Sequence, residues 1–434
     1  MGRKASLNVT GKSSVGYRQS SSQQAIILPT WIVAGMHLLL LYLLLMSFLS
    51  GDHISSMNGD LRGYMEVARD IKLVALESWK SYYSLYFYPP LANITFLIAD
   101  YNRFKVLPYD WGLLITNLCF ALAGYLYIVD ILSRRDARWV FFAILLSILL
   151  LMPSTFFARY EFFTTFLLLL SALSVRRGKT AFSGFFLGAA VMMKFAPLFF
   201  LPVFLALIPR GKWRRFLAGF GVAIIVPCLL YEAILGPGAT FDLFKGFFAF
   251  RAKQSVYIFS TFGSIDFTVA RILGSIATVV WLDPNLGHFV MDFPSITPTL
   301  LQLLSLAGEI IIAIIVWKDP LKQENILLYI GAAVFWLLFS TSFCNMHYYL
   351  WGLPFVFLWL LERAESGQKL TRRHAGLLIV TIAIALLGQF MFPYAYYLLM
   401  YYQTPIAIIA NLLRNLLVFA VTIACLKFAM LHEE

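Results

Sequence analysis

Long apolar runs, separated by short polar or basic segments, occupy the chain from residue 26 to about residue 430. A helix of about 20 apolar residues crosses the ~30 Å hydrocarbon core of a bilayer. The pattern therefore predicts an all-α, polytopic integral membrane protein with about 12 membrane helices. The runs expected to cross singly are Ile26–Leu49, Trp111–Leu132, Trp139–Phe157, Phe162–Val175, Phe216–Leu235, Leu300–Trp317, Asn325–Phe343, Leu350–Leu361, Ala375–Phe392 and Pro405–Leu426.

Basic residues gather in short segments between these runs, such as "SRRDAR", "VRRGK" and "RGKWRR". Lys and Arg are enriched in cytoplasmic loops, so we expect both termini in the cytoplasm and the chain in the inner (plasma) membrane. Residues 1–25 are polar and basic, which predicts a disordered cytoplasmic tail. Residues 26–430 then form a single transmembrane domain. Its two long polar regions, 50–110 and 236–297, are expected on the extracytoplasmic side.

Composition agrees with a membrane setting, since 60% of the 434 residues are hydrophobic and 17% are aromatic. The 34 Lys and Arg exceed the 22 Asp and Glu, giving a net charge of +12. Because the basic residues lie between spans and do not share one folded surface, they indicate topology and argue against nucleic-acid binding. The four cysteines lie in or beside apolar runs without metal-binding or redox spacing.

One charged residue, Lys194, lies within a short apolar region. "VRRGK" and "RGKWRR" are both expected in the cytoplasm, yet only residues 180–209 separate them. Two arms of about 14 residues would each reach ~21 Å, too short for full crossings. The chain therefore predicts a hairpin of two short helices that bends at "KFAP", where Pro197 interrupts the helix. Lys194 would sit at the tip, deep in the membrane from the outer side.

A cation at that depth costs ~2.5–3.5 kcal/mol unless it is paired or hydrated. Lys194 thus implies either an anionic ligand in a wet cavity or a structural ion pair, for example with Glu161.

The surrounding motifs resemble those of the GT-C glycosyltransferases, specifically the bacterial polyprenyl-phosphate-mannose-dependent mannosyltransferases. That group often has Arg-Tyr-Asp at the outer start of a span, a basic cytoplasmic turn, a Gly-rich helix, and a Lys followed by Pro. Here these are "RYE" from Arg159 to Glu161, then "VRRGK", then Gly184 and Gly188, then Lys194 before Pro197. Glu161 in place of aspartate keeps the charge and lengthens the arm.

Two further segments carry the resemblance, which spans roughly residues 50–365. The first outer loop reads "NGDLRGYMEVARDI" and then "YPPL", with Asp60 and Tyr88 at the matching positions. Near the other end, "FSTSFCNMHYYLWGLPFVF" matches at Tyr348 and Trp351, although "NMH" replaces the familiar Pro-Gln.

The resemblance implies transfer of a sugar from a polyprenyl phosphate to an acceptor hydroxyl at the outer face, usually with inversion. Asp60 would act as the general base, with Asp52 in reserve. Lys194 and Arg159 would stabilise the departing lipid phosphate. Glu161 and Tyr88 match motif positions and are counted among the substrate contacts.

Mannose is favoured by the resemblance alone, and the acceptor could be a glycan, glycolipid or protein. No cofactor is expected besides the lipid-linked donor. A divalent metal is not expected, because the first loop lacks the closely spaced aspartates that some GT-C members use.

Other candidate residues are ambiguous. Arg251 and Ser255 resemble an Arg and Ser in a late outer loop of the family that contacts donor or acceptor, but an interfacial segment with snorkelling cations fits equally. His347 could bind a sugar, whereas an aromatic belt explains Tyr348 as well.

Arg414 and Glu309 lie inside predicted spans. Either could be functional, although the position of Arg414 beyond the resemblance favours a structural role.

Two other functional classes remain open. A lipid-linked sugar flippase or transporter would also use many spans and buried charges, but it commonly shows an internal repeat and paired broken helices; this sequence indicates one break, at Lys194. A ligase using a lipid-diphosphate donor is the second alternative, and it would be expected to depend on a large outer loop later in the chain.

Overall fold

The fold is known from a computed structural model, which describes residues 59–73, 88–102, 109, 112–113, 115–116, 160–253, 256–273, 279–281, 289–291, 294, 296–344, 346–365, 371–391, 398–399 and 402–430. The expected tail and the predicted spans Ile26–Leu49 and Trp139–Phe157 lie outside these residues, as does most of Trp111–Leu132.

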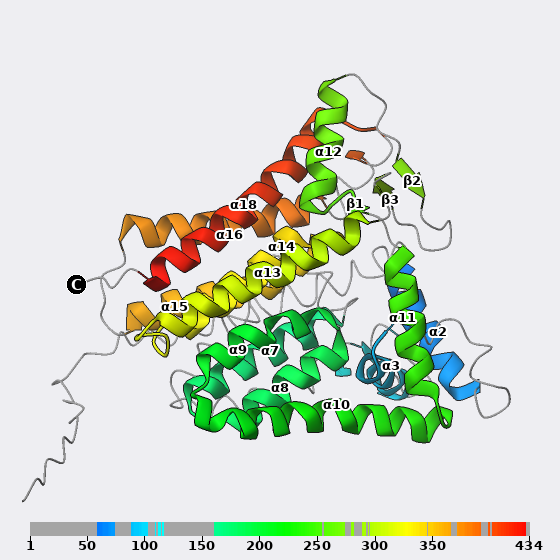
Figure 1. Ribbon diagram of the computed structural model, residues 1–434. Helices are drawn as coiled ribbons and strands as arrows, with labels where there is room; N and C mark the ends of the chain where they lie inside the picture. Colours follow the sequence, from blue (N-terminus) through cyan, green and yellow to red (C-terminus); the bar gives the residue numbers. More distant parts are fainter. Residues whose placement is uncertain are drawn as a thin grey trace, which may run out of the picture.

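The described chain is mostly helical (Figure 1). Its α-helices are α2 (Gly59–Leu73), α3 (Pro90–Asn102), α7 (Glu161–Arg176), α8 (Thr180–Met193), α9 (Leu201–Leu207), α10 (Trp213–Leu235), α11 (Ala239–Lys253), α12 (Thr261–Ile272), α13 (Thr297–Lys318), α14 (Ile326–Ser340), α15 (Leu353–Glu365), α16 (Arg372–Gln389) and α18 (Pro405–Met430). Its 3₁₀ helices are η3 (Ala196–Phe200), η4 (Arg210–Lys212) and η5 (Met346–Trp351).

Three of the described helices are long and apolar enough to cross a membrane, namely Arg210–Leu235, Thr297–Lys318 and Pro405–Met430. They coincide with three of the runs predicted to cross singly. Shorter apolar helices include Phe163–Arg176, Thr180–Met193, Ala196–Leu207 and Ile326–Ser340. The protein is thus a helical membrane protein, and the total of about 12 spans stays a prediction.

The predicted hairpin of two short helices is present. Helix α8 ends at Met193, and Lys194 is its C-cap with an extended backbone (φ −157°, ψ 127°). The chain then forms η3, which has Pro197 in its first turn, and returns as α9. The break therefore falls at Lys194, two residues earlier than the position at which proline alone would place it.

The two long polar regions contain regular structure. Helices α2 and α3 lie in residues 50–110, and α11 and α12 lie in residues 236–297. The all-α prediction was wrong in one detail, because the second region also holds a small antiparallel sheet in the order β1–β3–β2. Its strands are β1 (Val256–Tyr257), β2 (Val279–Trp281) and β3 (Phe289–Met291). Runs of two or three residues carry too little periodicity to be recognised in a sequence.

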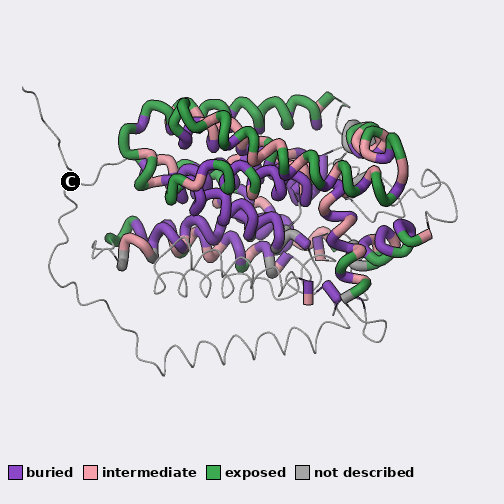
Figure 2. The backbone as a smooth tube through the Cα atoms, turned by 90° about the horizontal axis from the view of Figure 1, so that it is seen from below, coloured by how far each residue is buried: buried purple, intermediate pink, exposed green. Residues whose placement is uncertain are grey.

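Burial divides the helices into central and peripheral ones (Figure 2). Helix α14 is central, since every residue except Trp336 and Phe339 is buried. Helix α10 is peripheral, and its buried residues form one stripe spaced mostly four apart (Phe216, Ala223, Pro227, Tyr231 and Leu235). Exposed Leu, Ile and Val side chains cover the rest of α10, as lipid contact requires.

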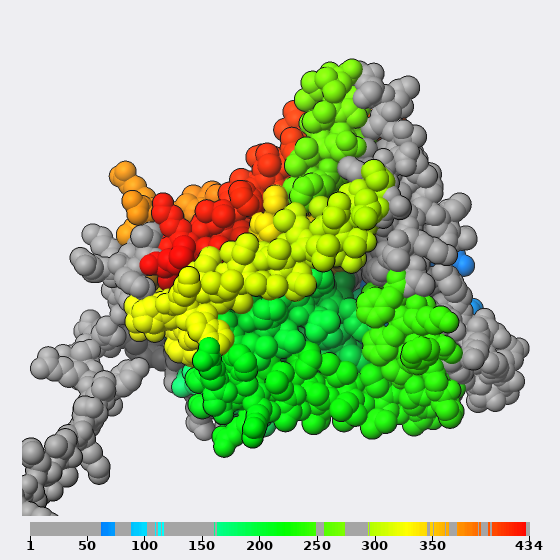
Figure 3. Space-filling model, in the orientation of Figure 1, coloured from blue at the N-terminus to red at the C-terminus, as the bar shows by residue number. Residues whose placement is uncertain are grey.

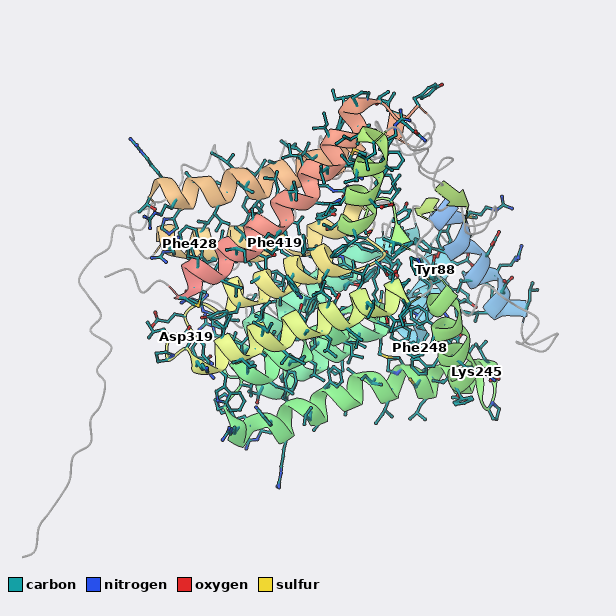
Figure 4. The ribbon with its side chains drawn as sticks, turned by 45° about the horizontal axis from the view of Figure 1, so that its top comes forward. Tyr88, Lys245, Phe248, Asp319, Phe419 and Phe428 are labelled. Atoms are coloured by element: carbon teal, nitrogen blue, oxygen red, sulfur yellow. The ribbon has the colours of Figure 1, made fainter. Side chains whose placement is uncertain are left out.

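The two ends of the helical body differ in chemistry. At one end, which we call the basic end, Arg176 of α7 forms an ion pair with Glu362 of α15. Arg210 lies over the Trp317 ring at 4.4 Å, and Asn325 donates a hydrogen bond to the Ala429 carbonyl. Figure 4 labels Asp319 and Phe428 at this end, and Tyr88, Phe248 and Lys245 at the opposite end, where α2 and α11 lie.

Glycine allows α8 and α10 to pack backbone to backbone. A Cβ atom added to Gly184 would lie 1.9 Å from the Phe216 carbonyl oxygen, and one added to Gly219 would lie 2.0 Å from the Ala181 carbonyl oxygen. Gly188 makes a similar approach to Phe220. The Gly-rich helix is therefore a small-xxx-small packing surface.

We expect Gly219→Ala to destabilise the protein by about 1–3 kcal/mol, because the new methyl group must separate two backbones. The matched control is Gly221→Ala on the same helix, where a Cβ meets nothing within 4 Å. Thermal unfolding midpoints in detergent measure both. Equal midpoints for the two variants would contradict the close-packing account.

Candidate functional site

The candidate site begins at Lys194, where α8 breaks. Its backbone N–H still donates to the Ala190 carbonyl at 2.9 Å, so the helix continues up to this residue. The following residues enter η3, which leaves Lys194 at the turn of the hairpin. Its side chain is half-buried and retains access to solvent or ligand.

Three aromatic rings surround the Lys194 ammonium group, and we call them the lysine cage. The Nζ atom lies 3.6 Å from the centroid of the Tyr348 ring, 5.2 Å from that of Trp351 and 5.5 Å from that of Tyr160. Each ring presents electron density to a cation, and such a contact stabilises by about 0.5–2 kcal/mol. The cage therefore offsets part of the cost of placing an ammonium group in the membrane.

Local structure explains why two cage residues act together. Tyr348 and Trp351 are three residues apart in η5, and side chains with that spacing eclipse one another in a 3₁₀ helix. Their rings stack with centroids 5.3 Å apart. Tyr160, the third ring, is the N-cap of α7 and lies in the middle of the "RYE" motif.

A second aromatic group joins the lysine cage to α2. Tyr64, Tyr88, Phe96 and Tyr160 contact one another in every pairwise combination, with centroids 4.4–5.7 Å apart. We call these residues the aromatic cluster. Asp60 lies in the first turn of α2, one helical turn before Tyr64 and on the same helix face. A chain of contacts thus runs from the α2 face that carries Asp60, through Tyr64 and Tyr160, to Lys194.

The structure describes the predicted site residues to different degrees. It brings Lys194, Tyr348 and Tyr88 together through the lysine cage and the aromatic cluster. Asp60, Glu161, Arg251 and His347 have a described backbone in α2, α7, α11 and η5, and their side chains lie outside the described part. Asp52, Arg159 and Ser255 lie outside the described residues.

Sequence reasoning did not select three residues that the structure places at the site: Tyr160, Trp351 and Tyr64. Tyr160 and Trp351 belong to the motifs, but neither carries a charge that would mark it as a site residue. Tyr64 follows Asp60 by four residues, and that helical spacing is the signal that could have identified it.

A buried polar network lies beside the lysine cage. Arg414 of α18 is fully buried, and its Nη2 atom donates to the Phe259 carbonyl and to Asn411 Oδ1, both at 2.8 Å. Its guanidinium lies 4.7 Å from the centroid of the Tyr349 ring. Tyr349 in turn donates to Asn415 Oδ1 at 2.6 Å. We call these residues the Arg414 network.

The Arg414 network connects elements that are distant in sequence. Asn415 Nδ2 donates to Ser264 Oγ at 2.9 Å, and Asn411 Nδ2 donates to the Ile258 carbonyl at 3.1 Å. Helix α18 therefore holds the turn after β1 and the start of α12 against η5, the element that supplies Tyr348 and Trp351. These hydrogen bonds support the structural role that the sequence favoured for Arg414.

Acidic groups elsewhere in the described part of the chain are either buried singly or too scattered to hold a metal ion. Glu309 of α13 is fully buried, and neither carboxylate oxygen has a hydrogen-bond partner there. No group of three or more His, Cys, Asp or Glu side chains among the described residues could hold a metal ion. That the protein needs no divalent metal is still an expectation from the sequence.

We expect Arg414→Met to lower the free energy of unfolding by about 2–3 kcal/mol, because hydrogen bonds from a charged donor are lost and their buried acceptors are left unsatisfied. The matched control is Arg372→Met at an exposed position of α16, which should change stability by less than about 0.5 kcal/mol. Thermal unfolding in detergent compares the two. If both variants melt with the wild type, the network does not hold these elements together.

Comparison with known proteins supplies the family. Residues 86–341 match the family model described as glycosyltransferase family 87. No curated protein and no solved structure matches the chain. The matched segment covers more than half of the chain and includes Tyr88, Tyr160 and Lys194. It ends directly after α14. The resemblance to GT-C membrane glycosyltransferases is thereby confirmed at the level of the family, and the chain belongs to glycosyltransferase family 87.

Proposed function

We propose that this membrane glycosyltransferase transfers a hexose from a polyprenyl-phosphate donor to an acceptor hydroxyl at the extracytoplasmic face, with inversion. Mannose is the hexose that the motif resemblance favours. The acceptor is a glycan, glycolipid or protein. The single observation that carries the proposal is the half-buried Lys194 ammonium held in an aromatic cage at the helix break.

The reaction assigns a role to each charged residue. The acceptor oxygen attacks the anomeric carbon while Asp60, with Asp52 in reserve, takes the hydroxyl proton as general base. The bond between the anomeric carbon and the phosphate oxygen breaks, and the lipid leaves as a phosphate monoester carrying one more negative charge. Lys194 and Arg159 stabilise that charge, and an Arg can do so through two parallel hydrogen bonds.

The energetics of Lys194 favour an anionic ligand. Placing the ammonium in the membrane costs ~2.5–3.5 kcal/mol, and a cation–π contact returns about 0.5–2 kcal/mol. A phosphate oxygen accepts hydrogen bonds from an ammonium group directly. The Lys194 side chain is only partly buried, so it can be reached from outside the protein.

Apolar surface beside Lys194 suits an isoprenoid chain. The next residue, Phe195, contacts Phe244, Phe247 and Phe248 of α11, with ring centroids 4.5–6.0 Å apart. Phe248 is 61% exposed, so part of this apolar surface is open to an apolar ligand. The short hairpin also leaves the outer half of the bilayer open above its tip, where a lipid tail could lie.

Further contacts to donor or acceptor are assigned to Glu161, Tyr88, Arg251, Ser255, His347 and Tyr348. For Tyr348, the buried position against Lys194 favours a role in the site over a place in an aromatic belt. The transfer is proposed to need no divalent metal. The abundance of Lys and Arg at the basic end favours a cytoplasmic location for that end in the inner (plasma) membrane, with the lysine cage towards the opposite face.

Two other functions use the same features differently. A flippase would move the lipid-linked sugar without breaking its glycosidic bond, and the family assignment argues against it. A ligase would take a lipid-diphosphate donor in place of a monophosphate. Competition between monophosphate and diphosphate donors distinguishes the ligase from the proposed enzyme. A variant that binds the donor without turning it over distinguishes the flippase.

We expect Lys194→Gln to weaken binding of synthetic polyprenyl-phosphate mannose by about 10–100-fold, since a charge-assisted contact is worth about 1.5–3 kcal/mol. Lys194→Arg should retain most of the affinity. Lys212→Gln, at an exposed cation of the basic end, is the matched control. Direct binding to the purified protein in nanodiscs provides the measurement. The proposed donor site would be contradicted if Lys194→Gln bound the donor with unchanged affinity. It would also be contradicted if the wild type bound the diphosphate analogue more tightly than the monophosphate donor.

We expect Asp60→Asn to bind the same donor with wild-type affinity and to lose about 10²–10⁴-fold in transfer rate, because the amide cannot accept the hydroxyl proton. Transfer of radiolabelled mannose to glycolipid and polysaccharide extracts measures turnover. A flippase would be indicated if Asp60→Asn still moved labelled donor across vesicle membranes at the wild-type rate.

A further inference from the structure

A groove of about 420 Å³ runs between α16 and α18 at the basic end. The two helices lie along the edge of the body away from α10 (Figures 1 and 3). The groove size falls within the range of small-molecule sites, about 300–1,000 Å³. None of its lining residues has a role in the proposed transfer.

Small side chains keep the groove open. Its walls include Gly376 and Val380 from α16, and Ala420 and Ala424 from α18. A Cβ atom added to Gly376 would meet nothing within 4 Å, so the space beside this glycine is unfilled. The walls extend over eight residues of α16, from Arg373 to Val380, and over nine residues of α18, from Ala420 to Phe428. Each wall is roughly 10–12 Å long at about 1.5 Å per residue.

Two cations stand at one end of this apolar groove. Arg373 lies in the first turn of α16 and Lys427 in the last turns of α18, and both line the groove. Both side chains are exposed, and neither takes part in an ion pair within the described chain. The N-terminus of α16 adds a partial positive charge at the same place.

We propose that this groove binds an anionic glycerophospholipid from the leaflet at the basic end. The phosphate contacts Arg373 and Lys427, and the upper part of one acyl chain lies along Gly376 and Ala424. Charge complementarity selects this occupant, because basic pockets between membrane helices on the cytoplasmic side bind anionic head groups, whereas a neutral lipid leaves two cations uncompensated. The inference is independent of the proposed transfer reaction, since it uses neither Lys194 nor Asp60.

The test is native mass spectrometry of the full-length protein in a non-ionic detergent, titrated with dioleoyl phosphatidylglycerol or dioleoyl phosphatidylcholine. The wild type should bind the first phosphatidylglycerol about tenfold more tightly than phosphatidylcholine. The double variant Arg373→Gln/Lys427→Gln should lose about tenfold to thirtyfold in phosphatidylglycerol affinity, since each basic residue near a lipid surface contributes about a fivefold effect. Gly376→Leu, which fills the groove, should weaken binding of both lipids.

Matched variants separate this site from general charge and size effects. Arg372→Gln/Arg214→Gln removes two exposed cations at the same end outside the groove, and Gly221→Leu enlarges another glycine whose Cβ would meet nothing. Both should retain wild-type lipid affinity. The proposal is overturned if the wild type binds the two lipids equally, if the control pair loses as much affinity as the groove pair, or if Gly376→Leu binds phosphatidylglycerol normally.

Discussion

The Lys194 ammonium group, held against the faces of Tyr348, Trp351 and Tyr160 at the turn of a helical hairpin, is the interaction on which the rest of the site depends. A cation in the membrane needs compensation, and aromatic faces provide it without neutralising the charge. The cage therefore holds the ammonium group at the turn of the hairpin, beside the aromatic cluster.

The cage draws its rings from elements far apart in sequence, and each is fixed by its own packing. Close backbone contact at Gly184 and Gly219 fixes α8 against α10, which sets the depth of the hairpin. Tyr160 is fixed by the aromatic cluster, which also joins the cage to α2 and its Asp60. Helix η5 is fixed by Tyr349, through the Arg414 network.

The separation of charge along the body gives the two ends different tasks. The basic end is closed by contacts such as the Arg176–Glu362 ion pair and the Arg210–Trp317 contact, and its exposed cations suit an anionic leaflet. The opposite end holds aromatic rings, irregular turns, a small sheet and the half-buried Lys194. Irregular backbone of this kind is tolerated near a membrane where protein or water satisfies its polar groups.

The amino-acid pattern alone predicted the membrane setting, the three long spans that the structure describes and the short hairpin at Lys194, because span length and charge placement follow directly from bilayer thickness and the cost of burying charge. It also indicated the family through "RYE", "KFAP" and the segment around Tyr348. It missed the short strands, whose pairing is set by partners many residues away. Only the tertiary structure decided that Tyr160, Tyr348 and Trp351 meet at one ammonium group and that Arg414 holds η5. Those contacts join residues 34 to 157 positions apart, and no local periodicity records which distant faces pack together.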